Sequence, residues 1–265
     1  MRQRLDIKIA RSGFRLKPLS FWLFLIAITM SEIMVVYSLP VIGIACYWVL
    51  LLYAIIQPVF NTNNRSSNLL LGLSMIPLIR IISISLPLIN IPQVLWYPLI
   101  YAPLLAAAIV VMHVTGLKAS DIGFIWKRIY LQIPIGIIVG LGIGLWEYII
   151  LRPKPLPSAF SLESVWLPAL MLFLTTGLVE EIIFRGVLQK LAIPLLGSFW
   201  SMLFLSIIFA VLHFGFYSSM DVLLVFMVAM VFAIAVKTTG SIWGVFFAHG
   251  TANVILFTVA PFILS

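Results

Sequence analysis

Residues 197–214 read GSFWSMLFLSIIFAVLHF and contain no Asp, Glu, Lys or Arg. An uncharged apolar run of roughly 18 or more residues is long enough to cross the hydrocarbon core of a membrane as an α-helix. Its apolar positions are continuous, whereas a membrane-spanning β-strand alternates apolar and polar positions. This segment therefore predicts a transmembrane helix with one histidine, His213, near its end.

Eight further segments have the same character and are separated by proline, glycine or clusters of charge. They lie near residues 19–38, 41–60, 68–89, 94–113, 130–151, 164–189, 220–236 and 241–262. The total falls from nine to eight if the first two form one broken hairpin or if one segment is re-entrant. We predict an all-α protein, a polytopic transmembrane helical bundle of about eight spans.

The composition supports one compact membrane domain. Of the 265 residues, 63% are hydrophobic and 9% are charged. At roughly 20 apolar residues per span, this supplies about eight spans and leaves little for an extramembrane domain. Soluble α/β enzymes and disordered chains are excluded because both contain far more polar and charged residues. The single cysteine, Cys46, excludes an intrachain disulfide and a cysteine-based zinc site.

The charge distribution predicts the orientation in the membrane. The formal net charge is +8, and six of the sixteen Lys and Arg residues lie within residues 1–17, before the first apolar segment. If this start is cytoplasmic, twelve basic residues lie inside and only Arg152 and Lys154 lie outside. We therefore expect a multi-pass plasma-membrane protein with a cytoplasmic N-terminus, with membrane lipid and not nucleic acid as a partner.

Ionisable side chains inside apolar segments are functional candidates, because each is costly to place in hydrocarbon. They are Glu32, Arg80, Glu147, Glu180, Glu181, Arg185, His213 and His249. Glu32 and Arg80 could pair between the first and third segments, and Glu147 lies within about one helical turn of the external interface. For these three residues a structural role is favoured.

The stretch EEIIFR at residues 180–185 contains the first motif. Glu181 and Arg185 are four residues apart, so on a helix they form an ion pair that neutralises both charges. Glu180 is rotated about 100° from Glu181 and lacks that partner. A carboxylate in this position suits a general base.

Two further motifs each contain a histidine. Phe209 and His213 are four residues apart, and His249 and Asn253 share one face of the last apolar segment. The second pair can donate hydrogen bonds to an oxyanion, and two histidines with a glutamate could hold a metal ion. Each pair alone could be an interhelical hydrogen bond, but the combination indicates a site.

Four glycines in the fifth apolar segment predict a surface for close helix packing. They are Gly136, Gly140, Gly142 and Gly144. Small residues let the backbones of membrane helices approach closely. We expect no phosphate-binding role, because no strand precedes these glycines.

The order EExxxR, FxxxH and HxxxN, each in an apolar helix, resembles the CPBP family of intramembrane proteases, also called the Abi family. This family includes the type II CAAX prenyl proteases and bacteriocin-processing enzymes. The resemblance covers about residues 114–260, whereas residues 1–113 carry no family motif. We therefore divide the chain into N-terminal helices, 1–113, and a catalytic core, 114–265.

The resemblance implies an intramembrane endopeptidase that cleaves a membrane-associated protein, either a prenylated CAAX protein or a bacteriocin-like precursor. Glu180 and His213 would activate the hydrolytic water, while His249 and Asn253 would stabilise the oxyanion. The supporting residues would be Glu181, Arg185 and Phe209. The family has been described both as zinc metalloendopeptidases and as metal-independent glutamate proteases. Glu180, His213 and His249 could supply zinc ligands, but we expect no tightly held metal.

Two other classes of function fit the residues. A membrane scaffold or regulator could use a protease-like fold without catalysis. A proton-coupled transporter could use the glutamates and histidines as a proton relay, although such transporters often contain paired repeats and this chain has none that we can identify.

Overall fold

The computed structural model describes residues 18–37, 39–60, 65–86 and 91–264, so the basic segment 1–17 lies outside the described residues. Across these ranges the structure contains helices and no strand, and nine helices are long and apolar enough to cross a membrane. The predicted all-α bundle is confirmed. The first two apolar segments form two separate helices, which gives nine candidate spans.

The first five spans are continuous helices except for one break at Ser74. They are α1 (Pro18–Val36), α2 (Pro40–Phe60), α3 (Arg65–Leu73) with α4 (Met75–Ser85), α5 (Gln93–Thr115) and α6 (Ile129–Leu151). Gly116 ends α5 with a φ of 75°, a left-handed conformation that glycine adopts without strain.

The last four spans are less regular. They are α7 (Leu162–Leu172) continuing through η2 (Phe173–Val179) and η3 (Ile182–Leu188) into α8 (Gln189–Leu196), α9 (Ser198–Val211) with η4 (Phe214–Phe216), α10 (Ser219–Thr239), and α11 (Trp243–Val254) with η5 (Ile255–Val259) and α12 (Ala260–Ile263). The segments η2, η3 and η5 are π-helical. Single π-helical turns are frequent at functional sites, and two of these flank Glu180 and Glu181.

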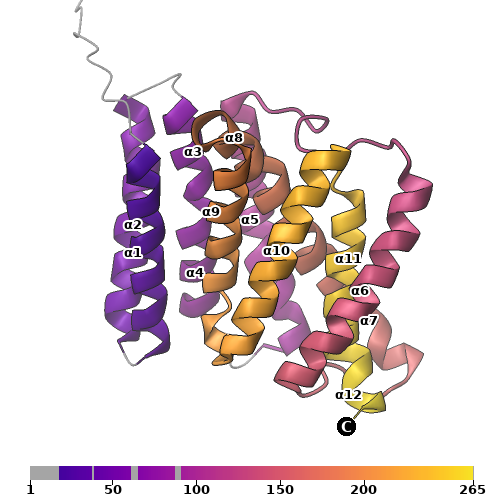
Figure 1. Ribbon diagram of the computed structural model, residues 1–265. Helices are drawn as coiled ribbons and strands as arrows, with labels where there is room; N and C mark the ends of the chain where they lie inside the picture. The colour runs from indigo at the N-terminus through magenta and orange to yellow at the C-terminus, as the bar shows by residue number, and fades with distance from the viewer. Residues whose placement is uncertain (1–17, 38, 61–64, 87–90, 265) are drawn as a thin grey trace, which may run out of the picture.

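Successive spans cross the bundle in opposite directions, so the described C-terminal end lies opposite the start of α1 (Figure 1). The basic residues are divided between the two ends. Near the start of α1 lie the ends of elements that carry Arg65, Lys118, Lys127, Arg128, Lys190 and Lys237. At the opposite end, α6 is followed by Arg152 and Lys154. This is the segregation that the sequence predicts.

Glycines let α6 pack directly against α11. A Cβ added to Gly136, Gly140 or Gly144 would press against a backbone carbonyl oxygen of α11. The predicted packing face is therefore confirmed at these three positions. It is wrong for Gly142, where an added Cβ would meet nothing within 4 Å. Because α11 carries two candidate site residues, this contact helps to set their position.

A buried ion pair ties the N-terminal helices together. Arg80 Nε donates to Glu32 Oε2 at 2.8 Å, Arg80 Nη2 also pairs with Glu32 Oε1, and the Tyr47 hydroxyl donates to Glu32 Oε2 at 2.5 Å. The Glu32 side chain is fully buried. The predicted pairing between the first and third apolar segments is thus confirmed, and it joins α1, α2 and α4.

Candidate active site

Glu181 lies at the centre of a buried charged network. Its Oε1 accepts from Arg185 Nη1 at 3.0 Å and lies 2.8 Å from His249 Nδ1. The predicted Glu181–Arg185 pair is confirmed, and both side chains are buried. The Arg185 guanidinium lies 4.6 Å from the centre of the Phe209 ring, a separation typical of a cation–π contact. Phe209 therefore contacts the supporting pair directly.

Glu180 points in another direction and has different partners. Its Oε1 accepts from the hydroxyl of Tyr101 on α5, and its Oε2 lies 3.8 Å from His249 Nε2. The side chain is 13% exposed, whereas that of Glu181 is 0% exposed. The two adjacent carboxylates thus divide as the helical geometry predicts. Tyr101 is a partner that the sequence analysis did not identify.

His213 follows the end of α9, and its Nδ1 lies 2.9 Å from the carbonyl oxygen of Phe209. A carbonyl oxygen can only accept, so this contact assigns the ring proton to Nδ1. The lone pair on Nε2 is then available to accept a hydrogen bond. His213 in this tautomer can take a proton from water.

His249 and Asn253 are held by partners from the span that contains Glu180. His249 Nδ1 donates to Glu181, so Nε2 is the ring nitrogen that remains for a ligand. Asn253 Nδ2 donates to Thr176 Oγ1 at 2.8 Å, and the Thr176 hydroxyl donates to a backbone carbonyl on α7 at 2.6 Å. The Asn253 amide keeps a second N–H. Thr176 is another partner that the sequence analysis did not identify.

One cavity brings together the four residues that the resemblance makes catalytic. It holds about 1080 Å³ of free space, including its open part. Its lining includes Glu180, His213, His249 and Asn253. The same cavity is lined by the aromatic residues Trp96, Tyr97 and Tyr101 of α5 and by Arg80 of α4. The N-terminal helices therefore form part of the wall of this site.

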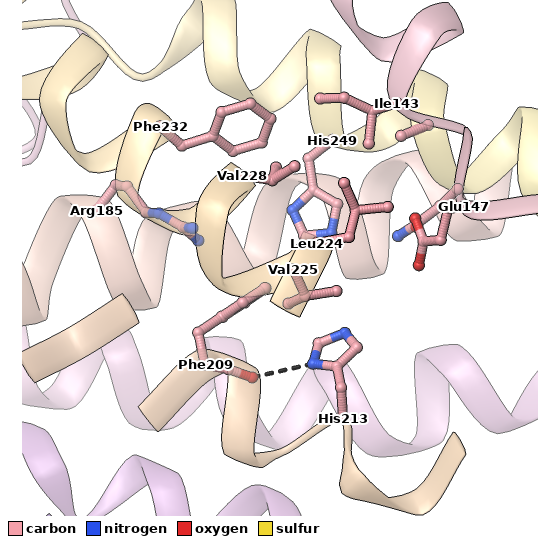
Figure 2. Close-up of a pocket in the computed structure, with 12 residues that line it drawn as sticks. Ile143, Glu147, Arg185, Phe209, His213, Leu224, Val225, Val228, Phe232 and His249 are labelled. Atoms are coloured by element: carbon pink, nitrogen blue, oxygen red, sulfur yellow. Dashed lines mark hydrogen bonds between the residues drawn. The ribbon is translucent and has the colours of Figure 1, made fainter. Parts of the chain in front are cut away.

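A second pocket of about 430 Å³ adjoins the same histidines (Figure 2). Its walls are apolar side chains of α6 and α10. Figure 2 shows His213, His249 and Glu147 pointing into it from three different elements. Glu147 is 8% exposed and lines both cavities. The structure therefore places Glu147 beside the candidate site, a location that the sequence analysis missed because it considered only the distance to the interface.

The zinc hypothesis requires Glu180, His213 and His249 to converge on one point. Within the described ranges, no group of three or more His, Cys, Asp and Glu side chains could hold a metal ion. The Nδ1 atoms of both histidines are also engaged by protein oxygens. As arranged here, the three residues do not form a ligand set, so we derive the chemistry below from the side chains alone.

Comparison with known proteins gives one match. Residues 162–255 match the model of the family described as "Type II CAAX prenyl endopeptidase Rce1-like". No curated protein and no solved structure matches the chain. The matched region is narrower than residues 114–260, but it contains all seven candidate site residues. This match supports the family that the three motifs resemble, and the chain therefore carries, in residues 162–255, a domain of the Rce1-like type II CAAX prenyl endopeptidase family.

Proposed function

We propose that this protein is an intramembrane endopeptidase that hydrolyses a peptide bond in a membrane-associated protein. We place it in the plasma membrane with its N-terminus in the cytoplasm, on the basis of the segregated basic residues. The observation that carries the proposal is the single cavity lined by Glu180, His213, His249 and Asn253.

Glu180 and His213 are suited to activate a water molecule. His213 presents an Nε2 lone pair, because its Nδ1 is bound to a backbone carbonyl. Glu180 is held through Oε1 by Tyr101, which leaves Oε2 as an acceptor. A water between these groups gives up a proton as its oxygen attacks the carbonyl carbon of the scissile peptide bond.

His249 and Asn253 are suited to stabilise the negative oxygen that this attack creates. Asn253 has one N–H beyond the one given to Thr176. His249 can donate from Nε2 only when both ring nitrogens are protonated, since its Nδ1 proton is bound to Glu181. The carboxylate of Glu181 favours this imidazolium through its charge. When the tetrahedral intermediate collapses, the C–N bond breaks and the leaving amine takes the proton held by Glu180 or His213.

The surroundings of the site fit a substrate that reaches it from the membrane. The second pocket has apolar walls, and the main cavity is lined by aromatic side chains of α5. These surfaces suit a prenylated CAAX protein or a bacteriocin-like precursor. In each case the substrate is a membrane-associated protein or peptide.

The test is a quantitative survey of new protein termini in cells that carry the wild-type chain, Glu180→Ala or His213→Ala at matched expression. Glu163→Ala is the matched control, because Glu163 belongs to the same span but is exposed at its start. We expect a set of termini that is present with the wild type and Glu163→Ala and absent with the other two. If all four samples match while deletion still has a phenotype, the protein is a scaffold or regulator and the proposal fails.

A further inference from the structure

A third pocket opens at the end of the bundle where α10 ends and α6 begins (Figure 1). It holds about 630 Å³ of free space, including its open part, and lies between the α5–α6 connection, α8 and the end of α10. Its polar lining residues are Ser120, Asp121, Arg185, Gln189, Lys190 and Lys237. None of the proposed catalytic residues lines this pocket.

The wall formed by the α5–α6 connection is fixed by contacts with the α10–α11 turn. The carbonyl of Gly123 accepts from the Ile242 backbone N–H at 3.0 Å, and the Ser241 hydroxyl donates to the carbonyl of Ile125 at 3.2 Å. Gly123 has a φ of 92°, which a residue with a side chain rarely adopts. The pocket is therefore a formed feature of the fold.

The pocket combines two cations at its edge with polar groups at its base. Lys190 and Lys237 are exposed, and neither forms an ion pair within the part of the chain that the structure describes. Asp121 supplies one opposing charge, and its carboxylate accepts from the backbone N–H of Lys118 at 2.9 Å. Arg185 and Gln189 are buried at the base. Glu181 already neutralises Arg185, so the two lysines leave the pocket with a positive balance.

This pocket lies at the end of the bundle that carries most of the basic residues. Basic pockets between transmembrane helices on the cytoplasmic side are suited to phosphate headgroups of anionic lipids. We propose that this pocket binds a phosphate group, with Lys190 and Lys237 as its cationic contacts. The source we favour is the headgroup of an anionic phospholipid, because the pocket lies at the end of the helices. Arg185 lines both this pocket and the pocket of Figure 2.

The test measures thermal unfolding of the purified full chain in a neutral detergent during titration with phosphatidylglycerol, phosphatidylcholine or inorganic phosphate. The test variant is Lys190→Gln with Lys237→Gln. The control variant is Arg65→Gln with Lys127→Gln, which removes two exposed charges from the same end outside the pocket. A lysine beside an anionic headgroup strengthens binding roughly five-fold, so loss of both should weaken it roughly 30-fold.

We expect phosphatidylglycerol to raise the unfolding temperature of the wild type and the control variant at concentrations that leave the test variant unchanged. The double substitution of Lys190 and Lys237 by Arg should restore the response, which separates loss of charge from poor folding. A response to inorganic phosphate alone would assign the site to a free anion. An equal response of the wild type, test and control variants, or no response to phosphatidylglycerol and phosphate, would overturn the proposal.

Discussion

Substitution of Gly140 by alanine tests whether the α6–α11 contact holds the candidate site in place. A Cβ at Gly140 would touch the carbonyl oxygen of Ala248 and lie 2.7 Å from the Cβ of Thr251. Non-bonded carbon atoms prefer separations of roughly 3.5–4.0 Å. The two helices must therefore separate locally by about 1 Å. Ala248 and Thr251 lie on either side of His249 in the sequence, so this shift displaces the imidazole from Glu181 and Glu180.

The expected cost falls mainly on catalysis. A displacement of about 1 Å in a catalytic group can reduce the rate roughly 100-fold. Overpacking also costs roughly 1–3 kcal/mol of stability, partly offset by roughly 1 kcal/mol from the better helix propensity of alanine. The assay is the initial rate of cleavage of a substrate identified by the survey of termini, with the unfolding temperature measured on the same preparations.

Gly142→Ala is the matched control, because an added Cβ there meets nothing within 4 Å. It should keep the wild-type cleavage rate and be at least as stable, since it gains helix propensity without a clash. If Gly140→Ala keeps the full rate, or if both variants lose activity equally, the α6–α11 contact does not position His249 and the reasoning fails.

Three further substitutions test individual contacts. Asn253→Ala should lower kcat roughly 10²–10³-fold if its amide donates to the oxyanion, and a change confined to KM would indicate substrate positioning instead. Tyr101→Phe should lower kcat roughly 10–100-fold with little change in KM, the equivalent of one hydrogen bond to a charged group; an unchanged kcat would remove Tyr101 from the positioning of Glu180. Arg80→Ala should lower the free energy of unfolding by roughly 3–5 kcal/mol because it leaves Glu32 buried without its cation, while replacing both by leucine should recover most of the loss. Chemical denaturation measures this last effect, and equal losses in the single and double variants would contradict it.

The sequence predicts the spans closely because membrane crossing depends on local composition. The fifth segment was expected at 130–151 and forms α6 at Ile129–Leu151. The Glu181–Arg185 pair could also be predicted, since both residues lie on one helical segment and the period of the helix fixes their relation. Gly142 was wrongly included in the packing face because spacing was ignored. Gly136, Gly140 and Gly144 recur every four residues on one face, whereas Gly142 is rotated about 200° from Gly140.

The partners of the site residues could not be predicted from the sequence. Tyr101 is 79 residues from Glu180, and Thr176 is 77 residues from Asn253. A hydroxyl group in an apolar segment carries no charge that marks it as unusual, so neither residue was identified. The π-helical turns around Glu180 are also absent from the sequence pattern, since they depend on how this span packs against α5 and α11.

The division between matched and unmatched parts of the chain has a physical consequence for specificity. The proposed chemical groups lie within residues 162–255, where the family match is found. Part of the cavity wall, including Tyr101 and Arg80, comes from helices outside that match. Groups that touch the reacting atoms are constrained by the reaction, whereas groups on the wall are constrained by the shape and polarity of the substrate. The family match therefore bears on the bond that is broken, and exchanging α4 and α5 with those of a relative should change which protein is cleaved while leaving the peptidase chemistry in place.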